Sequence, residues 1–282
     1  MRADLHLHTC YSDGKDTPAG IAARAKEAGV ALVSMTDHDS LEGLEEKRAA
    51  AQSCGLLCVA GWEVSSYGAI GKVHVLGYGC RQNGAYDGFL RERKEGALVR
   101  AEDCIRKANA YFGTSLNLED ALRERPKEQT PLHTMHVVRA YARVLNTGKN
   151  ALETAPGELY EQYFSKGKPA YSDLCRPTPA DALRIVHETG GIAVLAHPGR
   201  IEAGAAREAL MDELCALGLD GIECVYTTHT PEETAYFTRY ARSHGLLVTG
   251  GSDFHAEDGR RFVGKPVFEA DERLLRALRI VS

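Results

Sequence analysis

The stretch that decides the fold lies at the start of the chain and reads Arg2-Ala3-Asp4-Leu5-His6-Leu7-His8-Thr9-Cys10-Tyr11-Ser12-Asp13-Gly14. On an extended strand alternate side chains share a face, so His6 and His8 point the same way and can bind one ion together. A single His-x-His motif is a weak signal, because edge strands often carry two histidines without a chemical role. Its meaning depends on whether the rest of the chain supplies similar ligands.

Histidines and carboxylates recur downstream, mostly at the ends of short apolar runs. These clusters are Thr36-Asp37-His38, Gly61-Trp62-Glu63, His74, Ala196-His197-Pro198-Gly199 and Gly251-Ser252-Asp253-Phe254-His255. Imidazole and carboxylate groups are common ligands of divalent metals. The repeated pattern predicts a metal-dependent hydrolase that holds several ions in one pocket.

Between these clusters, apolar runs alternate with helical stretches. Thr17-Pro18 and Thr178-Pro179 are typical helix starts, Ser40 can cap a helix that runs to Cys54, and Thr230-Pro231-x-Glu233 has the form of a capping box. We expect strands near 31–35, 56–60, 73–78, 192–196, 221–223 and 246–249, besides the first one. Seven strand–helix repeats with polar residues at the carboxyl ends of the strands predict a parallel barrel, whose chemistry lies at that face.

The alternation stops between residues 82 and 165, where no clear strand signal occurs. Leu98, Ala101, Ile105, Ala108 and Phe112 follow the spacing of a buried helix face. Further helices are expected from a cap at Asn117 and over 133–145, with a stop near Gly148. We interpret 82–165 as a helical insertion that acts as a lid or specificity subdomain. Residues 1–81 and 166–282 then form the main domain.

Composition limits the classes of partner. The 282 residues carry a formal net charge of −5, with 44% hydrophobic and 26% charged residues, which is ordinary for a soluble protein. The negative charge argues against an extended nucleic-acid surface. No apolar run approaches the roughly 20 residues that span a bilayer, and no secretory signal precedes Asp4 and His6. We therefore expect a cytoplasmic protein without membrane attachment.

The eight cysteines do not form a Cys-x-x-Cys pair. Most lie in apolar stretches, where a free cysteine behaves as a small buried hydrophobe. Cys10 is close to the expected site, but nothing around it indicates a nucleophile. We expect neither a zinc–cysteine site nor a disulfide framework.

Taken together, the His6-x-His8, Ser12-Asp13-Gly14, Thr36-Asp37-His38, Gly61-x-Glu63, Ala196-His197-Pro198-Gly199 and Gly251-Ser252-Asp253-x-His255 motifs resemble the PHP (polymerase and histidinol phosphatase) family. The likeness is to its stand-alone phosphoesterase branch and covers residues 1–80 and 165–260 in the family's order. It implies an α/β fold, a distorted (β/α)7 barrel, with a trinuclear metal site usually filled by manganese, iron or zinc.

The resemblance also implies a ligand set. One metal would be held by His6, His8, Glu63 and Asp253, a second by Asp13, His38 and His255, and a third by His74, His197 and again Glu63. Asp13 stands where some relatives use histidine, and its hard oxygen suits manganese or iron(II) at least as well as zinc. Asp37 is expected to orient a histidine, and Glu223 either lines the site or makes structural hydrogen bonds.

Such a site suits phosphoryl chemistry. Adjacent cations can lower the pKa of a shared water to near neutrality and can neutralise phosphoryl oxygens as charge develops. We expect in-line attack on phosphorus by a hydroxide that bridges the first two metals, with Glu63, Asp253 and His255 as catalytic residues. The general acid stays open between Asp253 and a nearby histidine.

Substrate contacts are sought among basic and histidine residues near the strand ends. Arginine is the better fork for phosphate, and the candidates are Arg176, Arg200, Lys168, His136 and His229. Relatives often carry an Arg-Pro-His run where this chain has Thr134-Met135-His136. The histidine matches, but the missing Arg-Pro leaves the usual substrate of the branch in question.

Several functions stay open. We favour hydrolysis of a small phosphorylated metabolite, a nucleotide or sugar phosphate, as a monoester, bisphosphate or cyclic diester. A 5′-3′ exoribonuclease acting on short RNA and a histidinol phosphate phosphatase are alternatives, and C–N bond hydrolysis is a weaker one. The non-enzymatic alternative is a metal-binding, polymerase-associated module, although no polymerase segment follows before Ser282. The sequence does not define the oligomeric state.

Overall fold

The computed structural model describes residues 1–125, 132–147, 154–257 and 259–281. The chain divides into two compact units, one of residues 1–86 and 177–282 and the other of residues 87–176. Helix α3 (Gly84–Phe112) begins in the last residues of segment 1–86, and most of its length belongs to the second unit. Among the described residues, no helix has both the length and the apolar character needed to cross a membrane.

In the described part of the first unit, nine strands form two sheets. One sheet has the order β3-β2-β1-β9 and the other β4-β5-β6-β7-β8. The strands are β1 (Arg2–Leu7), β2 (Leu32–Met35), β3 (Leu57–Cys58), β4 (Gly61–Gly68), β5 (Gly71–Tyr78), β6 (Ile192–Leu195), β7 (Gly221–Tyr226), β8 (Leu247–Gly251) and β9 (Phe268–Glu269). Isolated bridges between Leu7 and Phe254, and between His38 and Glu63, connect the sheets at the carboxyl ends of β1 and β2.

The sheets are mixed, so the expected all-parallel arrangement is wrong. β4 and β5 pair antiparallel as a hairpin, and β5 is also antiparallel to β6. The hairpin turn lies between Gly68 and Gly71, and Gly71 has a φ of 109°, a conformation that glycine adopts without strain. Strands joined by so short a turn can only run antiparallel. Glu63 consequently lies within β4 and not in a loop behind a third parallel strand.

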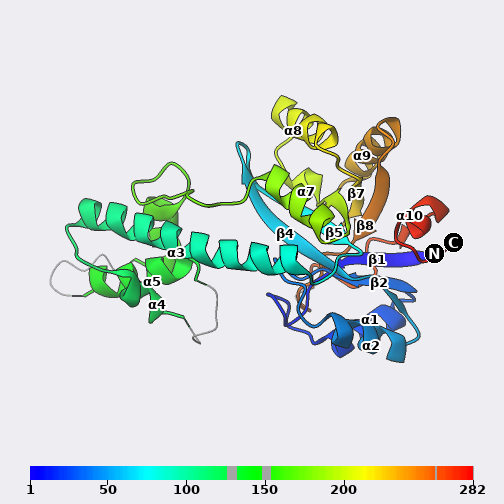
Figure 1. Cartoon of the computed structure of the whole chain (residues 1–282), viewed down its shortest axis with the longest axis horizontal. Helices are drawn as coiled ribbons and strands as arrows, with labels where there is room; N and C mark the ends of the chain where they lie inside the picture. Colours follow the sequence, from blue (N-terminus) through cyan, green and yellow to red (C-terminus); the bar gives the residue numbers. More distant parts are fainter. Residues whose placement is uncertain (126–131, 148–153, 258, 282) are drawn as a thin grey trace. The chain divides into compact units, whose positions relative to one another are not determined.

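Helices cover the outer faces of both sheets (Figure 1). The helices α1 (Pro18–Glu27) and α2 (Leu44–Ser53) lie beside the sheet that contains β1, whereas α7 (Pro179–Glu188), α8 (Ala205–Ala216) and α9 (Pro231–Ser243) lie beside the other. The short α10 (Glu272–Ala277) follows β9. The expected caps at Thr17, Thr178 and Thr230 are confirmed.

One predicted cap is wrong. α2 begins after Gly43, whose φ is 70°, and not after Ser40. The Ser40 hydroxyl instead accepts a hydrogen bond from the backbone N–H of Glu42. The helix therefore begins about one helical turn later than the sequence predicts, and this affects the position of Lys47.

A hydrophobic core draws on both sheets. Its buried members include Ala3 and Leu5 of β1, Leu76 of β5, Val194 of β6 and Leu247 of β8. Because successive side chains of a strand point to opposite faces, every second residue of these strands enters this core and the residues between them point away from it. A separate cluster packs α1 and α2 onto the first sheet.

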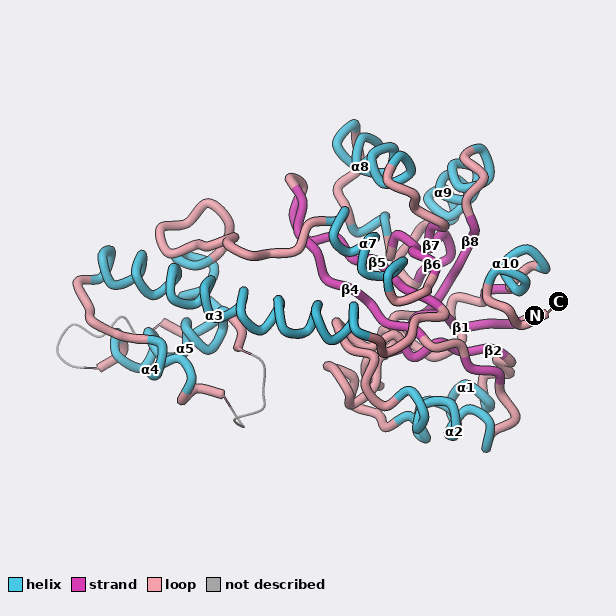
Figure 2. Tube along the Cα trace, viewed as in Figure 1, coloured by secondary structure: helices cyan, strands magenta, loops and turns pink. Residues whose placement is uncertain are grey.

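The second unit is helical in its described residues (Figure 2). It contains most of α3, followed by α4 (Leu118–Leu122), α5 (Thr134–Leu145), α6 (Pro156–Leu159) and a π-helical turn (Tyr160–Phe164). The predicted buried face of α3 is confirmed, because Ala101, Ile105 and Ala108 are buried against α5 residues such as Val137 and Tyr141. The predicted cap at Asn117 is confirmed as a capping box with Asp120. The expected stop near Gly148 lies outside the described residues.

Candidate metal centre

The carboxyl ends of several strands bring the sequence clusters together. His6 is the penultimate residue of β1, and His8 follows that strand. His38, His197 and Asp253 come within three residues of the ends of β2, β6 and β8. β8 approaches β1 closely at this end, since a Cβ on Gly251 would lie 2.4 Å from the Cβ of His6. Only glycine allows this approach, and it places Asp253 beside the two N-terminal histidines.

A first group consists of His6, His8, Glu63 and Asp253, all buried. The Nε2 atom of His6 lies 3.3 Å from Glu63 Oε2 and 3.3 Å from Asp253 Oδ1. The Nε2 atom of His8 lies 3.2 and 3.1 Å from the same two oxygens. Two imidazole nitrogens and two carboxylate oxygens therefore converge on one point, as the sequence predicts for the first metal.

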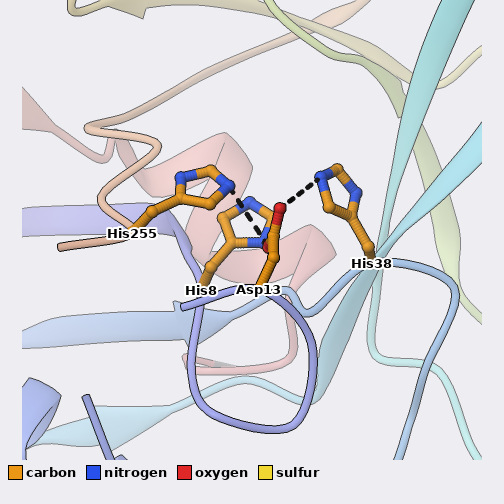
Figure 3. A group of neighbouring side chains, drawn as sticks. All are labelled: His8, Asp13, His38 and His255. Carbon is orange, nitrogen blue, oxygen red and sulfur yellow. Dashed lines mark ion pairs between the residues drawn. The ribbon is translucent and has the colours of Figure 1, made fainter. Parts of the chain in front are cut away.

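A second group consists of His8, Asp13, His38 and His255 (Figure 3). The Asp13 carboxylate oxygens lie 3.3 Å from His255 Nε2, 3.7 Å from His38 Nε2 and 3.5 Å from His8 Nδ1. The Asp13 side chain is 55% exposed, in contrast to the fully buried first group. This group is accordingly the more accessible of the two.

A third group contains His38, Glu63 and His74. Glu63 Oε1 lies 2.6 Å from His74 Nδ1 and 2.9 Å from His197 Nε2, while its Oε2 lies 3.0 Å from His38 Nδ1. His197, which the sequence predicts here, is thus beside the group without being among its members. Glu63 is shared between the first and third groups, and its two oxygens face different histidines.

The donor atoms suit divalent cations. His6 Nε2, His8 Nδ1 and Nε2, His38 Nδ1, His74 Nε2 and Glu63 Oε2 are buried without a hydrogen-bond partner in the described structure. Buried polar atoms normally have such partners. Here the histidine nitrogens face carboxylate oxygens without hydrogen-bond geometry, and this is the arrangement expected when a cation binds between them. Burial lowers the pKa of His38 to about 4, which keeps this ring in the neutral form that binds metals.

The backbone is strained at two of these residues. His197 has a φ of 30° and Asp253 a φ of 53°. Non-glycine residues in this region cost of the order of 1–3 kcal/mol each and concentrate at functional sites. Here the strain directs both side chains away from their strands and toward Glu63 and His6.

Glu223 on β7 orients two of the histidines. Its Oε1 lies 2.9 Å from His6 Nδ1, and its Oε2 accepts a hydrogen bond of 2.7 Å from the backbone N–H of His197. The contact fixes the His6 tautomer, because a proton on Nδ1 leaves Nε2 free to face Glu63 and Asp253. Of the two roles expected for Glu223, lining the site or making structural hydrogen bonds, the observed contacts show hydrogen bonds, and these go to His6 and His197.

Asp37 does not orient a histidine, contrary to expectation. The described partners of its carboxylate are Thr9, Ser12 and Lys47. The cause is that Asp37, in the segment after β2, is turned toward the loop that follows β1, where these groups take up both of its carboxylate oxygens.

The outer oxygen of Asp253 is held by groups that the motifs do not include. Tyr226 donates to Oδ2 at 2.7 Å, Arg261 lies at 3.2 Å, and Arg200 at 3.7 Å. Burial opposes ionisation of Asp253, but His6 and His8 outweigh it and hold the pKa of this carboxyl well below its usual value. Asp253 therefore stays ionised, which suits a ligand and not a general acid.

Sequence reasoning missed three contributors to this site: Asp4, Tyr226 and Arg261. Asp4 accepts backbone hydrogen bonds from Ser252 and Gly264 and so ties β1 to the segment that carries Asp253. Its parity with His6 and His8 on β1 is a signal that could have indicated it. Tyr226 is the last residue of β7, the strand that also carries Glu223, but Arg261 lies in a loop where the sequence offers no such signal.

The remaining candidate residues are distributed over both units. His229 uses Nδ1 toward the Cys224 carbonyl and accepts from the Gly199 N–H at Nε2, which favours a structural role over the predicted substrate contact. His136 accepts from the His133 N–H. His136, Lys168 and Arg176 belong to the second unit, and their role in binding substrate stays a prediction.

Comparison with known proteins places the chain in a family. The model of the PHP domain matches residues 4–122. The chain is 33% identical, over 92% of its length and 96% of the relative, to phosphoribosyl 1,2-cyclic phosphate 1,2-diphosphodiesterase of Eggerthella lenta. It is 32% identical, over 97% and 98%, to 3′,5′-nucleoside bisphosphate phosphatase of Chromobacterium violaceum. The chain belongs to the PHP family.

Two further similarities bear on the function. A 5′-3′ exoribonuclease of Haemophilus influenzae is 30% identical, with 93% of each chain covered. A solved structure from Chromobacterium violaceum, described as an amidohydrolase with bound sulfate and no metal, superposes with a TM-score of 0.71 at 30% identity, covering 99% of this chain and 96% of the other. These relatives match the whole chain, so the likeness includes the helical unit.

Proposed function

We propose that this chain is a metal-dependent phosphoesterase that hydrolyses a small phosphorylated metabolite. The observation that carries the proposal is the set of buried histidine nitrogens that face Glu63 and Asp253 without hydrogen-bond partners. The relatives with names that specify phosphatase or phosphodiesterase activity support it. The proposed reaction is cleavage of a phosphoric ester bond by water.

The ligand assignment follows the three groups, except that His8 is given to the first ion alone and His197 replaces His38 at the third. His6, His8, Glu63 and Asp253 would hold one divalent ion, and Asp13, His38 and His255 a second. His74 and His197 would hold a third with Glu63 as the shared carboxylate. The mixture of imidazole and carboxylate favours manganese or iron, with zinc also suited.

Bound divalent cations would supply positive charge for the phosphoryl oxygens and a water nucleophile active at neutral pH. The protein's part is to keep the ligands fixed and ionised. Glu63 separates its oxygens between two groups, and Glu223 holds His6 in one tautomer. Because Asp253 is held ionised by its neighbours, a histidine is the better candidate for the proton donor to the leaving group.

Arg200 is the candidate anion contact at this site. Its Nη1 lies 3.7 Å from the outer oxygen of Asp253, and its side chain is 52% exposed. An arginine that pairs with a buried carboxylate at one edge keeps further N–H groups for a phosphate. Arg200 is a residue that the sequence predicts for this role, whereas Arg261 donates to the Asp253 carbonyl and the Tyr226 hydroxyl.

A phosphate-release screen tests the function. The chain, loaded with Mn²⁺, is assayed on nucleoside monophosphates, 3′,5′-bisphosphates and cyclic phosphates, and we expect release from at least one class. His38→Ala and Asp253→Ala should each lower turnover by roughly 100-fold or more, since both remove ligand atoms. Full turnover in both variants, or no release from any substrate, would contradict the proposal.

Exoribonuclease activity is a second candidate, favoured by the relative from Haemophilus influenzae. The reaction is again hydrolysis of a phosphoric ester, so the same donor groups would serve. The net charge of −5 opposes a long RNA-binding surface. Digestion of a short 5′-phosphorylated oligoribonucleotide, compared with its mononucleotides at several salt concentrations, distinguishes the two functions.

We further propose that the two sheets together make a distorted (β/α)7 barrel and that residues 82–165 act as a specificity subdomain. The bridges from Leu7 to Phe254 and from His38 to Glu63 support the first idea. The compact helical unit supports the second. His136→Ala, Lys168→Ala and Arg176→Ala should then raise KM for the natural substrate more than they lower kcat.

A further inference from the structure

Asp13 occupies a weakly packed position for a metal ligand. Its side chain is 55% exposed, whereas the other carboxylates of the centre, Glu63 and Asp253, are 1% and 2% exposed. It lies on a loop between β1 and α1, and so its position depends on how that loop is anchored. A ligand must be held within fractions of an ångström to bind its ion well.

The loop is anchored on one buried carboxylate. Asp37 Oδ1 accepts hydrogen bonds from the Thr9 N–H at 2.8 Å and from the Ser12 hydroxyl at 2.7 Å. Its Oδ2 accepts from the Thr9 hydroxyl at 2.8 Å. The residues on either side of the turn that leads to Asp13 are thus tied to the same side chain.

Lys47 completes this anchor from helix α2. Its Nζ lies 2.5 Å from Asp37 Oδ2, with the side chain 2% exposed and Asp37 fully buried. The Nζ also lies 5.5 Å from the centre of the Tyr11 ring. Tyr11 packs onto Gly43, where a Cβ would come within 2.2 Å of its ring, and its hydroxyl donates to Glu46. The first turn of α2 therefore holds both Asp37 and the loop.

Stability alone does not explain the pair. A buried ion pair loses the hydration of both charges, and well-packed apolar residues are often at least as stabilising. What the charges add here is geometry, since an ionised carboxylate accepts several hydrogen bonds from the loop at once. The delayed start of α2 after Gly43 places Lys47 where it can meet Asp37.

We propose that the Asp37–Lys47 pair is a positioning device that fixes the loop Thr9–Asp13 so that the Asp13 carboxylate faces His38 and His255. The proposal rests on the metal-dependent function proposed above. Asp37 and Lys47 act through Asp13 and do not themselves bind the ion. They set the affinity of the group His8, Asp13, His38 and His255 for its divalent cation.

The test measures Mn²⁺ binding to the full chain by titration calorimetry. Thr9→Val and Lys47→Met should weaken one ion per chain by about 10–100-fold and leave the others unchanged. Thr9→Ser keeps the hydroxyl that donates to Asp37 and should restore the affinity of wild type. Arg48→Met, which removes an exposed ion pair with Glu45 on the same helix, should change nothing.

Unfolding temperatures in chelator separate positioning from general damage, and Thr9→Val carries the test if Lys47→Met does not fold. Wild-type binding by Thr9→Val would overturn the positioning role alone. Equal weakening of every ion, together with a lower unfolding temperature in chelator, would overturn it as well. A wild-type chain that binds no Mn²⁺ would overturn the proposed function together with this inference.

Discussion

At the scale of single residues, one carboxylate connects most of the candidate centre. Glu63 Oε2 lies within 3.3 Å of nitrogens of His6, His8 and His38, and Oε1 lies within 2.9 Å of His74 and His197. Burial opposes its ionisation, but His74, His6 and His38 outweigh this and hold the pKa of Glu63 well below its usual value. The centre therefore behaves as one electrostatic unit and not as three independent sites.

The hydrogen bond from His6 to Glu223 gives a first prediction. Glu223→Gln keeps the shape of the side chain but removes the charge that holds the Nδ1 proton of His6. We expect the affinity for the ion bound by His6 to fall by about 10–100-fold, measured by metal titration. Glu213→Gln on the exposed face of α8 is the matched control. Equal affinities in both variants would show that Glu223 has no influence on the ligand.

The protonation of His8 gives a second prediction. Burial by itself lowers its pKa, yet the Asp253 and Glu63 carboxylates close to its Nε2 raise the pKa to about 9 in the metal-free chain. Only the unprotonated ring binds metal, so binding at neutral pH must release this proton, and affinity should rise with pH up to about 9. Calorimetry in two buffers with different ionisation enthalpies measures the release. A heat of binding that is independent of the buffer would refute it.

The sequence predicts the individual ligand residues well, but it predicts poorly the residues that hold the ligands in position. His6, His8, Glu63 and Asp253 are brought together as the motifs indicate, because strand parity and strand ends can be recognised locally. The partners of Asp37 could not be predicted, since Lys47 meets it only after an unexpected turn at Gly43. Arg261 lies only 8 residues after Asp253, but it stands in an irregular segment where no periodic pattern marks it.

At the scale of elements, helix starts are the most predictable feature. The caps at Thr17, Thr178 and Thr230 depend on residues within one turn, so local sequence determines them. The sequence does not predict the β4–β5 hairpin, because the apolar run over 73–78 that follows Gly68 and Gly71 also fits a parallel strand. Pairing direction depends on contacts between distant segments, which periodicity does not report.

The cap of α9 gives a third prediction. Thr230 accepts from the Glu233 N–H, and Glu233 accepts from the Thr230 N–H. Thr230→Ala should therefore lower the free energy of unfolding by about 1 kcal/mol, measured by urea denaturation of the metal-free chain. Arg239→Ala, at an exposed position in the same helix, should change it by less than about 0.5 kcal/mol. Similar values for the two variants would contradict the assigned cap.

At the scale of the whole molecule, the centre joins segments from both sheets. His6 belongs to one sheet and Glu63, His74 and Glu223 to the other. An ion bound by both must be released when the sheets separate, so metal binding contributes directly to stability.

Chelation gives a fourth prediction. An ion at 100 times its Kd stabilises the folded chain by about 2.7 kcal/mol, which corresponds to roughly 5 °C in Tm for a chain of this size. Removing the metal with a chelator should lower Tm by at least this amount, measured by calorimetry, and added Mn²⁺ should restore it. Identical Tm values with and without chelator would contradict a bound ion at this centre.

The pairing of β1 with β2 and β9, together with the contact of its end with the segment after β8, has a consequence for synthesis in the cell. His6 and His8 are synthesised long before Asp253 and His255, because they precede them in the chain by most of its length. Until Asp253 is made, the nascent chain offers only part of the first coordination group. Full-affinity loading must follow synthesis of Asp253, and chains that stop before it expose two histidines without the carboxylate that completes them.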